Sequence, residues 1–265
     1  MTRTARATIN YLGEMNVRPR YHAQDHARDN LVLDPRVVEI EDLRGGDPPS
    51  LAREGFTLVP HKSAVADFRD DPPAQATYAA EVERLILDVT GADRVVVTGG
   101  ALLRFGERSP LSGKLFNSLP ARFIHIDISD STARAFASQH EKAPVRRFAH
   151  YNIWRALTPP PQDVPLAVCD ARSLGVEDVA EADAVFDAPG APEWSFEGLL
   201  VRFNPRHRWC WFRDMTRDEA LVFKTNDSDP RQPHHIAHTA FDDGACLSGV
   251  PPRASVEARA IAYWY

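Results

Sequence analysis

The chain has 265 residues, which is enough for one large domain or two small ones. Its 43% hydrophobic and 26% charged residues are ordinary for a globular protein, and its formal net charge of −6 argues against a nucleic-acid-binding protein. The sequence contains no apolar run of about 18 residues, so we expect no membrane span.

Cysteine usage and the N-terminal sequence bear on the cellular compartment. The three cysteines, Cys169, Cys210 and Cys246, are far apart and do not have the spacing of zinc ligands. Residues 1–7 are polar and are not followed by the apolar segment of a secretory signal. These features predict a cytoplasmic protein with reduced thiols.

The first third of the sequence predicts short strands and one long helix. Short strands are expected at 8–12, 37–40, 55–59 and 94–98. Within 73–90, apolar residues recur with helical spacing, namely Tyr78, Val82, Leu85, Ile86 and Val89. Asp70 and Asp71 precede this helix and Gly91 ends it. A turn is expected at 98–100.

The rest of the chain predicts many short strands separated by turns. A short helix is expected at 130–140, with Asp130 or Ser131 as its N-cap, and the segments 106–121 and 174–192 are expected to be connections. Further strands are expected at 123–127, 146–157, 165–170, 199–203, 208–212, 220–224 and 256–265.

This pattern is mainly β with a helical buttress, and it predicts a double-stranded β-helix, or jelly roll. We expect a single domain over residues 1–265. In this interpretation, residues 1–93 form an N-terminal arm and the buttressing helix, and residues 94–265 form the jelly-roll core.

The motif His125-Ile126-Asp127 places an imidazole and a carboxylate two positions apart. On a β-strand these two side chains point to one face, whereas Ile124, Ile126 and Ile128 point to the other. One imidazole and one carboxylate side by side are two of the three ligands of a 2-His-1-carboxylate Fe(II) site. The motif alone also fits a strand with one hydrogen-bonded histidine and an aspartate at its edge.

Later residues supply the missing parts of such a site. His238 is followed by a strand-like segment, whereas His234 and His235 stand in a polar run and are interpreted as loop residues. Arg253 and Ser255 are again two positions apart, and a guanidinium with a neighbouring hydroxyl can hold a carboxylate. The order His-X-Asp, His, Arg-X-Ser predicts an Fe(II) site beside a carboxylate-binding site.

These motifs resemble those of Fe(II)/2-oxoglutarate-dependent oxygenases, in the family that groups the cephamycin 7α-methoxylation protein with gibberellin desaturase-like and fungal AsaB-like proteins. The resemblance extends over nearly the whole chain. It is densest in FNPRHRW (203–209), HTAFDD (238–243) and PRASVEAR (252–259). The segment 98–104 departs from it by being more apolar. If this segment lines the substrate site, the substrate differs from those of the relatives.

The resemblance implies that His125, Asp127 and His238 are the iron ligands, and that Arg253 with Ser255 receives the C5 carboxylate of 2-oxoglutarate. It further implies a single oxygenase domain that uses Fe(II), 2-oxoglutarate and O2. The enzyme would convert 2-oxoglutarate to succinate and CO2 while it hydroxylates, desaturates or cyclises a small molecule, expected to be a secondary-metabolite precursor.

Asn152, Lys224 and Arg259 are further candidates for the 2-oxoglutarate site. Two alternatives remain open at the level of sequence. One is a jelly-roll metalloenzyme that does not use 2-oxoglutarate, and the other is a non-catalytic partner that presents substrate to another enzyme of a biosynthetic pathway. The sequence leaves the oligomeric state open.

Overall fold

The computed structural model describes residues 4–69, 72–246 and 249–265. Asp70 and Asp71, which are expected to precede the long helix, lie outside the described residues. The α-helices are α1 (Pro72–Thr90) and α2 (Asp130–Ser138), and the 3-10 helices are η1 (His26–Arg28), η2 (Ala171–Ser173) and η3 (Val176–Asp178). The strands are β1 (Thr4–Leu12), β2 (Arg20–His22), β3 (Leu33–Asp42), β4 (Phe56–Pro60), β5 (Arg94–Phe105), β6 (His125–Ile126), β7 (Arg147–Ala156), β8 (Leu166–Cys169), β9 (Val179–Phe186), β10 (Trp194–Val201), β11 (Trp209–Trp211), β12 (Glu219–Asp227), β13 (His238–Ala240) and β14 (Ala254–Trp264).

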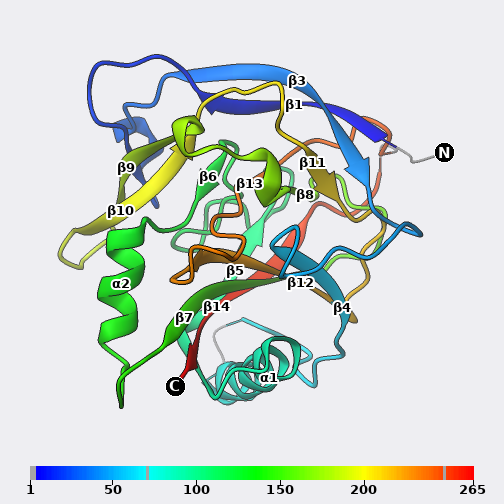
Figure 1. The fold of residues 1–265 in the computed structure, drawn as a ribbon. Helices are drawn as coiled ribbons and strands as arrows, with labels where there is room; N and C mark the ends of the chain where they lie inside the picture. Colours follow the sequence, from blue (N-terminus) through cyan, green and yellow to red (C-terminus); the bar gives the residue numbers. More distant parts are fainter. Residues whose placement is uncertain (1–3, 70–71, 247–248) are drawn as a thin grey trace.

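The strands form two sheets, as Figure 1 shows. The nine-stranded sheet has the order β1-β3-β11-β8-β13-β6-β10-β9-β2, and the five-stranded sheet has the order β4-β12-β7-β14-β5. Buried side chains from both sheets, among them Trp154, Leu166, Cys210 and Phe223, pack in one hydrophobic cluster between them. This mainly β architecture confirms the predicted jelly roll.

The first 93 residues contribute strands to both sheets. β1 pairs with β3 along its whole length, and β3 joins the nine-stranded sheet through parallel pairing with β11. β4 pairs with β12 and so becomes an edge of the five-stranded sheet. The N-terminal segment is thus hydrogen-bonded into the barrel and does more than buttress it.

α1 covers the outer face of the five-stranded sheet, below β7 and β14 in Figure 1. Its predicted apolar face is buried at Tyr78, Val82, Leu85 and Ile86. Alternate residues of β14, beginning at Val256, pack against this face. The intervening residues of β14 point into the barrel, and they include Ser255 and Arg259. Gly91 follows α1 with φ +64°, a left-handed conformation that favours glycine.

Two expectations from the sequence are wrong in this part of the fold. The segment 174–192, expected to be a connection, contains β9, whose inward positions are mostly alanine and so give a weak hydrophobic signal. The N-cap of α2 is Ser129, whose Oγ accepts a hydrogen bond from the Thr132 backbone N–H at 3.3 Å, and not Asp130 or Ser131.

The turn expected at 98–100 is a bulge inside β5. Glu257 of β14 pairs with Leu102 and Arg259 pairs with Thr98, so three residues of β5 face the single Ala258. The extra residues leave the backbone N–H of Ala101 without a partner in the sheet. The Gln75 Oε1 atom of α1 accepts that hydrogen bond at 2.7 Å.

Neither α1 nor any other helix in the described ranges has the combination of length and apolar composition that crossing a membrane requires.

We predict that Ile86→Ala lowers the free energy of unfolding by about 2–5 kcal/mol, because Ile86 is fully buried against the five-stranded sheet. Urea unfolding measures the change. Glu83→Ala, an exposed position on the same helix, is the control and should stay within about 0.5 kcal/mol of the wild type. Equal effects of the two substitutions would contradict the burial of this face.

Candidate metal centre

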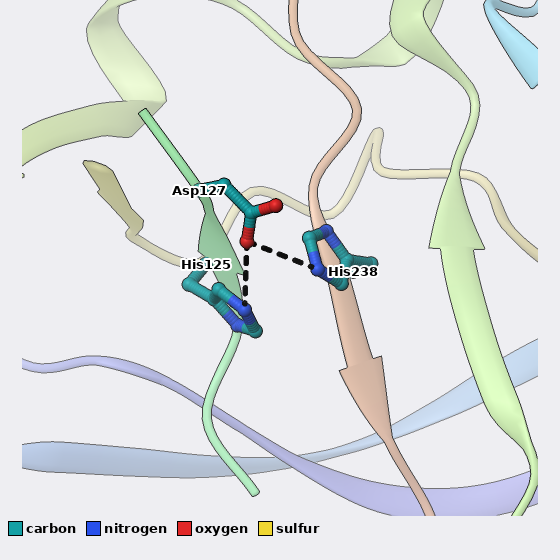
Figure 2. A group of neighbouring side chains, drawn as sticks. All are labelled: His125, Asp127 and His238. Carbon is teal, nitrogen blue, oxygen red and sulfur yellow. Dashed lines mark ion pairs between the residues drawn. The ribbon is translucent and has the colours of Figure 1, made fainter. Parts of the chain in front are cut away.

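Three side chains meet inside the barrel at the edges of two neighbouring strands. His125 begins β6, Asp127 directly follows it, and His238 begins β13, which pairs with β6 at His125 (Figure 2). The Asp127 Oδ1 atom lies 3.5 Å from His125 Nε2 and 3.7 Å from His238 Nε2. All three donor atoms lie within 4.8 Å of one another, so a single metal ion can reach them all.

Backbone carbonyls determine which ring nitrogen of each imidazole carries the proton. His125 Nδ1 lies 3.2 Å from the Phe123 carbonyl oxygen, and His238 Nδ1 lies 3.1 Å from that of Ile236. A carbonyl oxygen only accepts hydrogen bonds, so each Nδ1 carries the proton and each Nε2 keeps a lone pair. Burial, followed by the proximity of His125, lowers the pKa of His238 to about 4. His238 is therefore neutral at pH 7, as a metal ligand must be.

The apolar residues beside the motif point away from the metal centre, as the sequence predicts. Ile124 and Ile126 are buried in a cluster with Ile9 and Tyr11 of β1 and Ile40 of β3. Ile128 packs in a separate cluster against α2. This packing fixes the strand so that His125 and Asp127 face the barrel interior.

The second oxygen of Asp127 is held from the opposite sheet. Asn152 Nδ2 donates a hydrogen bond to Asp127 Oδ2 at 2.6 Å, and Arg259 Nε lies 3.5 Å from the same atom. Asn152 and Arg259 are cross-strand partners on β7 and β14. Arg259 in turn donates to Glu257 Oε1 at 2.7 Å. Burial acts to raise the pKa of Asp127, but its surroundings, first among them the charge of Arg259, outweigh burial and hold the pKa well below its usual range.

Arg253 is a buried cation without an anionic partner. Only 4% of the residue is exposed, and no carboxylate of the described residues lies within ion-pairing distance of its guanidinium. Its Nε donates to Ser255 Oγ at 3.1 Å, and its Nη1 donates to the Val164 carbonyl at 3.1 Å. Burial lowers the pKa of Arg253 to about 9, and the charges of Arg104 and Arg122 act in the same direction. A carboxylate ligand would remove this electrostatic penalty.

Trp154 adds an unpaired donor to the same region. It lines a narrow cavity together with Arg253, His125 and His238. Its indole Nε1 is buried and has no hydrogen-bond partner in the described part of the chain. A cation without an anion and a donor without an acceptor, next to two imidazoles, fit an anionic ligand that also reaches the metal.

The other three residues predicted for the 2-oxoglutarate site lie elsewhere. Asn152 and Arg259 contact the carboxylate of Asp127. Lys224 is buried with its Nζ 2.7 Å from Asp227 Oδ2, and it lines none of the cavities formed by the metal ligands or Arg253. The predicted contact of Lys224 with 2-oxoglutarate does not fit this placement, because the charge is already paired.

Glu257 was not singled out in the sequence. It lies between Ser255 and Arg259 on the inward face of β14 and holds the Arg259 guanidinium. The signal was present as the alternation Arg253, Ser255, Glu257, Arg259, which places four polar side chains on one strand face.

Asp130, His234 and His235 form a second group of possible metal ligands. Asp130 lies three residues after Asp127, and His235 lies three residues before His238. His234 Nε2 and His235 Nε2 lie 2.7 Å and 3.1 Å from Asp130 Oδ1, and Asn226 Nδ2 donates to the same oxygen at 2.8 Å. The Asp130 side chain is 71% exposed. Three donors already occupy its Oδ1, which accounts for the contacts without a metal. The structure thus agrees with the interpretation of His234 and His235 as loop residues.

Three cavities meet at the metal centre. The narrow one that contains Arg253 includes His125 and His238. A second, of about 270 Å³, includes His125 and Asp127, and a third, of about 370 Å³, includes Asp127. A metal bound at this junction would be accessible from the cavity that contains Arg253 and from the two larger cavities.

A jelly roll with three inward donors and an unpaired buried guanidinium has the properties of a non-haem iron oxygenase that takes a carboxylate co-substrate. Comparison with known proteins agrees. A family model described as "Oxidoreductase/YMDC permease-like domain" matches residues 9–263. The chain is 30% identical over 255 residues to the hydroxylase/desaturase CTB9 of Cercospora beticola, covering 86% of this chain and 76% of that protein.

Two further relatives specify the cofactors in their names. The Fe(II)/2-oxoglutarate-dependent dioxygenase nvfI of Aspergillus novofumigatus is 28% identical over 247 residues, which cover 88% of this chain and 85% of that protein. The solved structure of a tryptophan-to-phenylalanine variant of the iron and alpha-ketoglutarate-dependent endoperoxidase NvfI matches with a TM-score of 0.83 and 26% identity, covering 98% of this chain and 97% of that one. The chain belongs to this family of Fe(II)/2-oxoglutarate-dependent oxygenases.

We predict that His238→Ala weakens Co(II) or Fe(II) binding by more than roughly 100-fold, because one of three donors is lost. Equilibrium dialysis under anaerobic conditions, followed by elemental analysis, measures the affinity. His235→Ala is the matched control, since it removes the histidine three positions earlier, and should leave the affinity unchanged. A loss in His235→Ala with none in His238→Ala would mean that the wrong group of ligands has been assigned.

A matched pair of asparagines tests the support of Asp127. We predict that Asn152→Ala weakens metal binding by about 10- to 100-fold, because Asp127 Oδ2 loses its direct hydrogen bond and the carboxylate can rotate. Asn226→Ala, which removes the equivalent bond to Asp130, should bind metal as the wild type does. Unchanged affinity in Asn152→Ala would show that Arg259 alone positions the carboxylate.

Proposed function

We propose that His125, Asp127 and His238 hold the Fe(II), and that Arg253 and Ser255 bind the C5 carboxylate of 2-oxoglutarate. The observation that carries this proposal is the buried guanidinium of Arg253, which has no anionic partner among the described residues and shares a cavity with two of the proposed iron ligands. The family uses Fe(II), 2-oxoglutarate and O2, and the donor set of this chain fits that use.

The bound iron, with 2-oxoglutarate and O2, supplies the oxidising power that removes a hydrogen atom from a C–H bond, while 2-oxoglutarate becomes succinate and CO2. The chain's own residues do the rest. His125 and His238 present their Nε2 atoms because backbone carbonyls hold Nδ1–H. Asn152 and Arg259 keep one oxygen of Asp127 occupied, so Oδ1 is the oxygen that would bind iron.

The co-substrate would be positioned at its distal end. Arg253 offers its guanidinium, and Ser255 offers its hydroxyl hydrogen because Ser255 Oγ already accepts from Arg253 Nε. Both residues are buried, so their bonds to a carboxylate are formed away from water and are stronger for it. Trp154 Nε1 is a third available donor in this cavity.

The substrate is proposed to be a small molecule of secondary metabolism, oxidised by hydroxylation, desaturation or ring formation. This range follows the relatives, whose names include hydroxylase/desaturase and endoperoxidase. We further propose a cytoplasmic enzyme, in keeping with the free thiols of Cys169, Cys210 and Cys246.

The two alternatives from the sequence are less well supported. A metalloenzyme that does not use 2-oxoglutarate would have no use for the buried charge of Arg253. A non-catalytic partner would not require three donor atoms that are arranged to bind one metal ion. The relatives named as Fe(II)/2-oxoglutarate-dependent dioxygenases favour the oxygenase over both.

We predict that Arg253→Met raises the Kd for 2-oxoglutarate by roughly 100-fold or more, since breaking a buried charge pair costs about 2–5 kcal/mol. The affinity of Arg253→Lys for 2-oxoglutarate should fall between that of the wild type and that of Arg253→Met. Anaerobic titration of the Fe(II) protein, followed by the visible charge-transfer absorption of a chelated 2-oxo acid, measures affinity without turnover.

Pyruvate is the control ligand because it lacks the distal carboxylate. The wild type should prefer 2-oxoglutarate over pyruvate, and Arg253→Met should lose most of that preference. If the variant still binds 2-oxoglutarate with wild-type affinity, the assignment of Arg253 fails.

A further inference from the structure

The cavity of about 370 Å³ next to Asp127 has an aromatic wall. Asp127, Asn152 and Arg259 lie at the end nearest the metal centre. The aromatic wall consists of five side chains from β9, β10, α2 and the 106–121 loop, namely Phe116, Phe136, Phe186, Trp194 and Phe196. Segment 98–102, which departs from the family resemblance by being apolar, lines the same cavity through Thr98, Gly99, Gly100 and Leu102.

Two ring pairs of the aromatic wall are stacked, whereas Phe136 meets Phe196 edge to face at 75°. Phe186 and Trp194 are cross-strand partners on β9 and β10, with ring centroids 4.5 Å apart and planes inclined by 18°. Phe186 and Phe196 lie 5.3 Å apart at 28°. Trp194 and Phe116 remain 52% and 40% exposed, respectively, although large aromatic side chains usually bury more of their surface. Nearly parallel, partly uncovered rings offer a flat apolar surface to another flat ring.

Among its described lining residues, the cavity has no unpaired Lys, Arg, Asp or Glu side chain, and its two histidines are His140 and His150. Arg259 is the single Lys or Arg among its described lining residues, and it is already paired with Asp127 and Glu257. Asp127 is the single carboxylate of the described lining and belongs to the metal centre. A charged substrate group placed here would be buried without a counterion, which is strongly unfavourable.

The neighbouring cavity of about 270 Å³ has more charged residues in its described lining than the aromatic cavity has. It shares Asp127, Arg259, Phe186 and Phe196 with the aromatic cavity, so the two are continuous at the metal centre. Its other lining residues include His22, Asp29, Glu107 and Arg122. A molecule that extends through both cavities would place its apolar part on the aromatic wall, its polar part on the other side and its middle at the metal.

We propose that the aromatic cavity binds the primary substrate, and that this substrate carries an uncharged, flat ring system stacked on Phe186, Trp194 and Phe196. The inference rests on the proposed function for the meaning of "substrate", but the binding site itself is defined by the cavity alone. The oxidised carbon would belong to the part of the molecule next to the ring system, where the two cavities join.

Two fluorescent probes with one ring skeleton test the chemistry of the cavity. N-phenylnaphthylamine is neutral, and anilinonaphthalenesulfonate adds a negative charge. Titrated into the metal-free protein, the neutral probe should bind with enhanced emission, and the sulfonate should bind at least roughly tenfold more weakly. Equal or tighter binding of the sulfonate would overturn the proposal.

Two aromatic variants locate the bound probe. Trp194→Ala should weaken binding of the neutral probe roughly three- to tenfold, the worth of one ring–ring contact. Phe203→Ala is the matched control, because Phe203 is 38% exposed but packs against Tyr11, outside the cavity. An equal effect of both variants, or none in Trp194→Ala, would place the probe elsewhere and overturn the proposal.

The metal-ligand variant separates this inference from the proposed function. His238→Ala should bind the neutral probe as the wild type does, because His238 does not line the aromatic cavity. Failure of the wild type to bind Fe(II) would therefore remove the proposed function while the probe titration still decides the character of the cavity. Loss of probe binding in His238→Ala, with circular dichroism unchanged, would contradict the independence of the two sites.

Discussion

The site depends on how the two oxygens of Asp127 are divided between the sheets. Oδ1 faces His125 and His238, which belong to the nine-stranded sheet. Oδ2 is held by Asn152 and Arg259, which belong to the five-stranded sheet. A carboxylate is planar and rigid, so fixing one oxygen fixes the other. The geometry offered to a metal therefore depends on the packing between the sheets as much as on the strand that carries His125 and Asp127.

The arginines of the barrel interior differ in whether they have a carboxylate partner. Arg259 is neutralised by Asp127 and Glu257, whereas Arg253 has no carboxylate partner among the described residues and Arg104 bonds to oxygens of Asn117 and Leu119. The barrel interior near Arg253 thus has an excess of positive charge, which suits a ligand with two carboxylates. Because Arg104 holds the 106–121 loop through these contacts, the charge that attracts such a ligand also orders one wall of the entrance.

The parts of the site that could be predicted from the sequence are those encoded by local periodicity. His125 and Asp127 share a face because a strand repeats every two residues, and the same rule places Arg253 and Ser255 together. His238 was separable from His234 and His235 because only it begins a strand. Contacts that require the packed fold were not predictable. Lys224 forms a buried ion pair with Asp227. Asn152 and Arg259 reach Asp127 only because the two sheets face each other.

The alanines of β9 also explain why the sequence does not predict the cavity beside this strand. Its alternating Ala180, Ala182 and Ala184 look like a weak connection, yet they leave room on one face for Phe186 and its neighbours on β10. Small residues carry little hydrophobic signal even when their role is to make space. The sequence therefore does not predict the cavity with the aromatic wall, although it shows the apolar segment 98–104, part of which lines that cavity.

The bulge in β5 separates the shape of that cavity from the chemistry of the metal centre. Gly99, with φ +69°, and Gly100 lie in the bulge opposite Ala258 and line the cavity, while Arg259 on the partner strand keeps its place beside Asp127. Gln75 seals the gap from the outer helix. Lengthening or shortening this bulge by a residue would change the room available to a ring without moving His125, Asp127 or His238. Related chains could in this way diverge in substrate through insertions and deletions at one strand, with their ligands and co-substrate residues left intact.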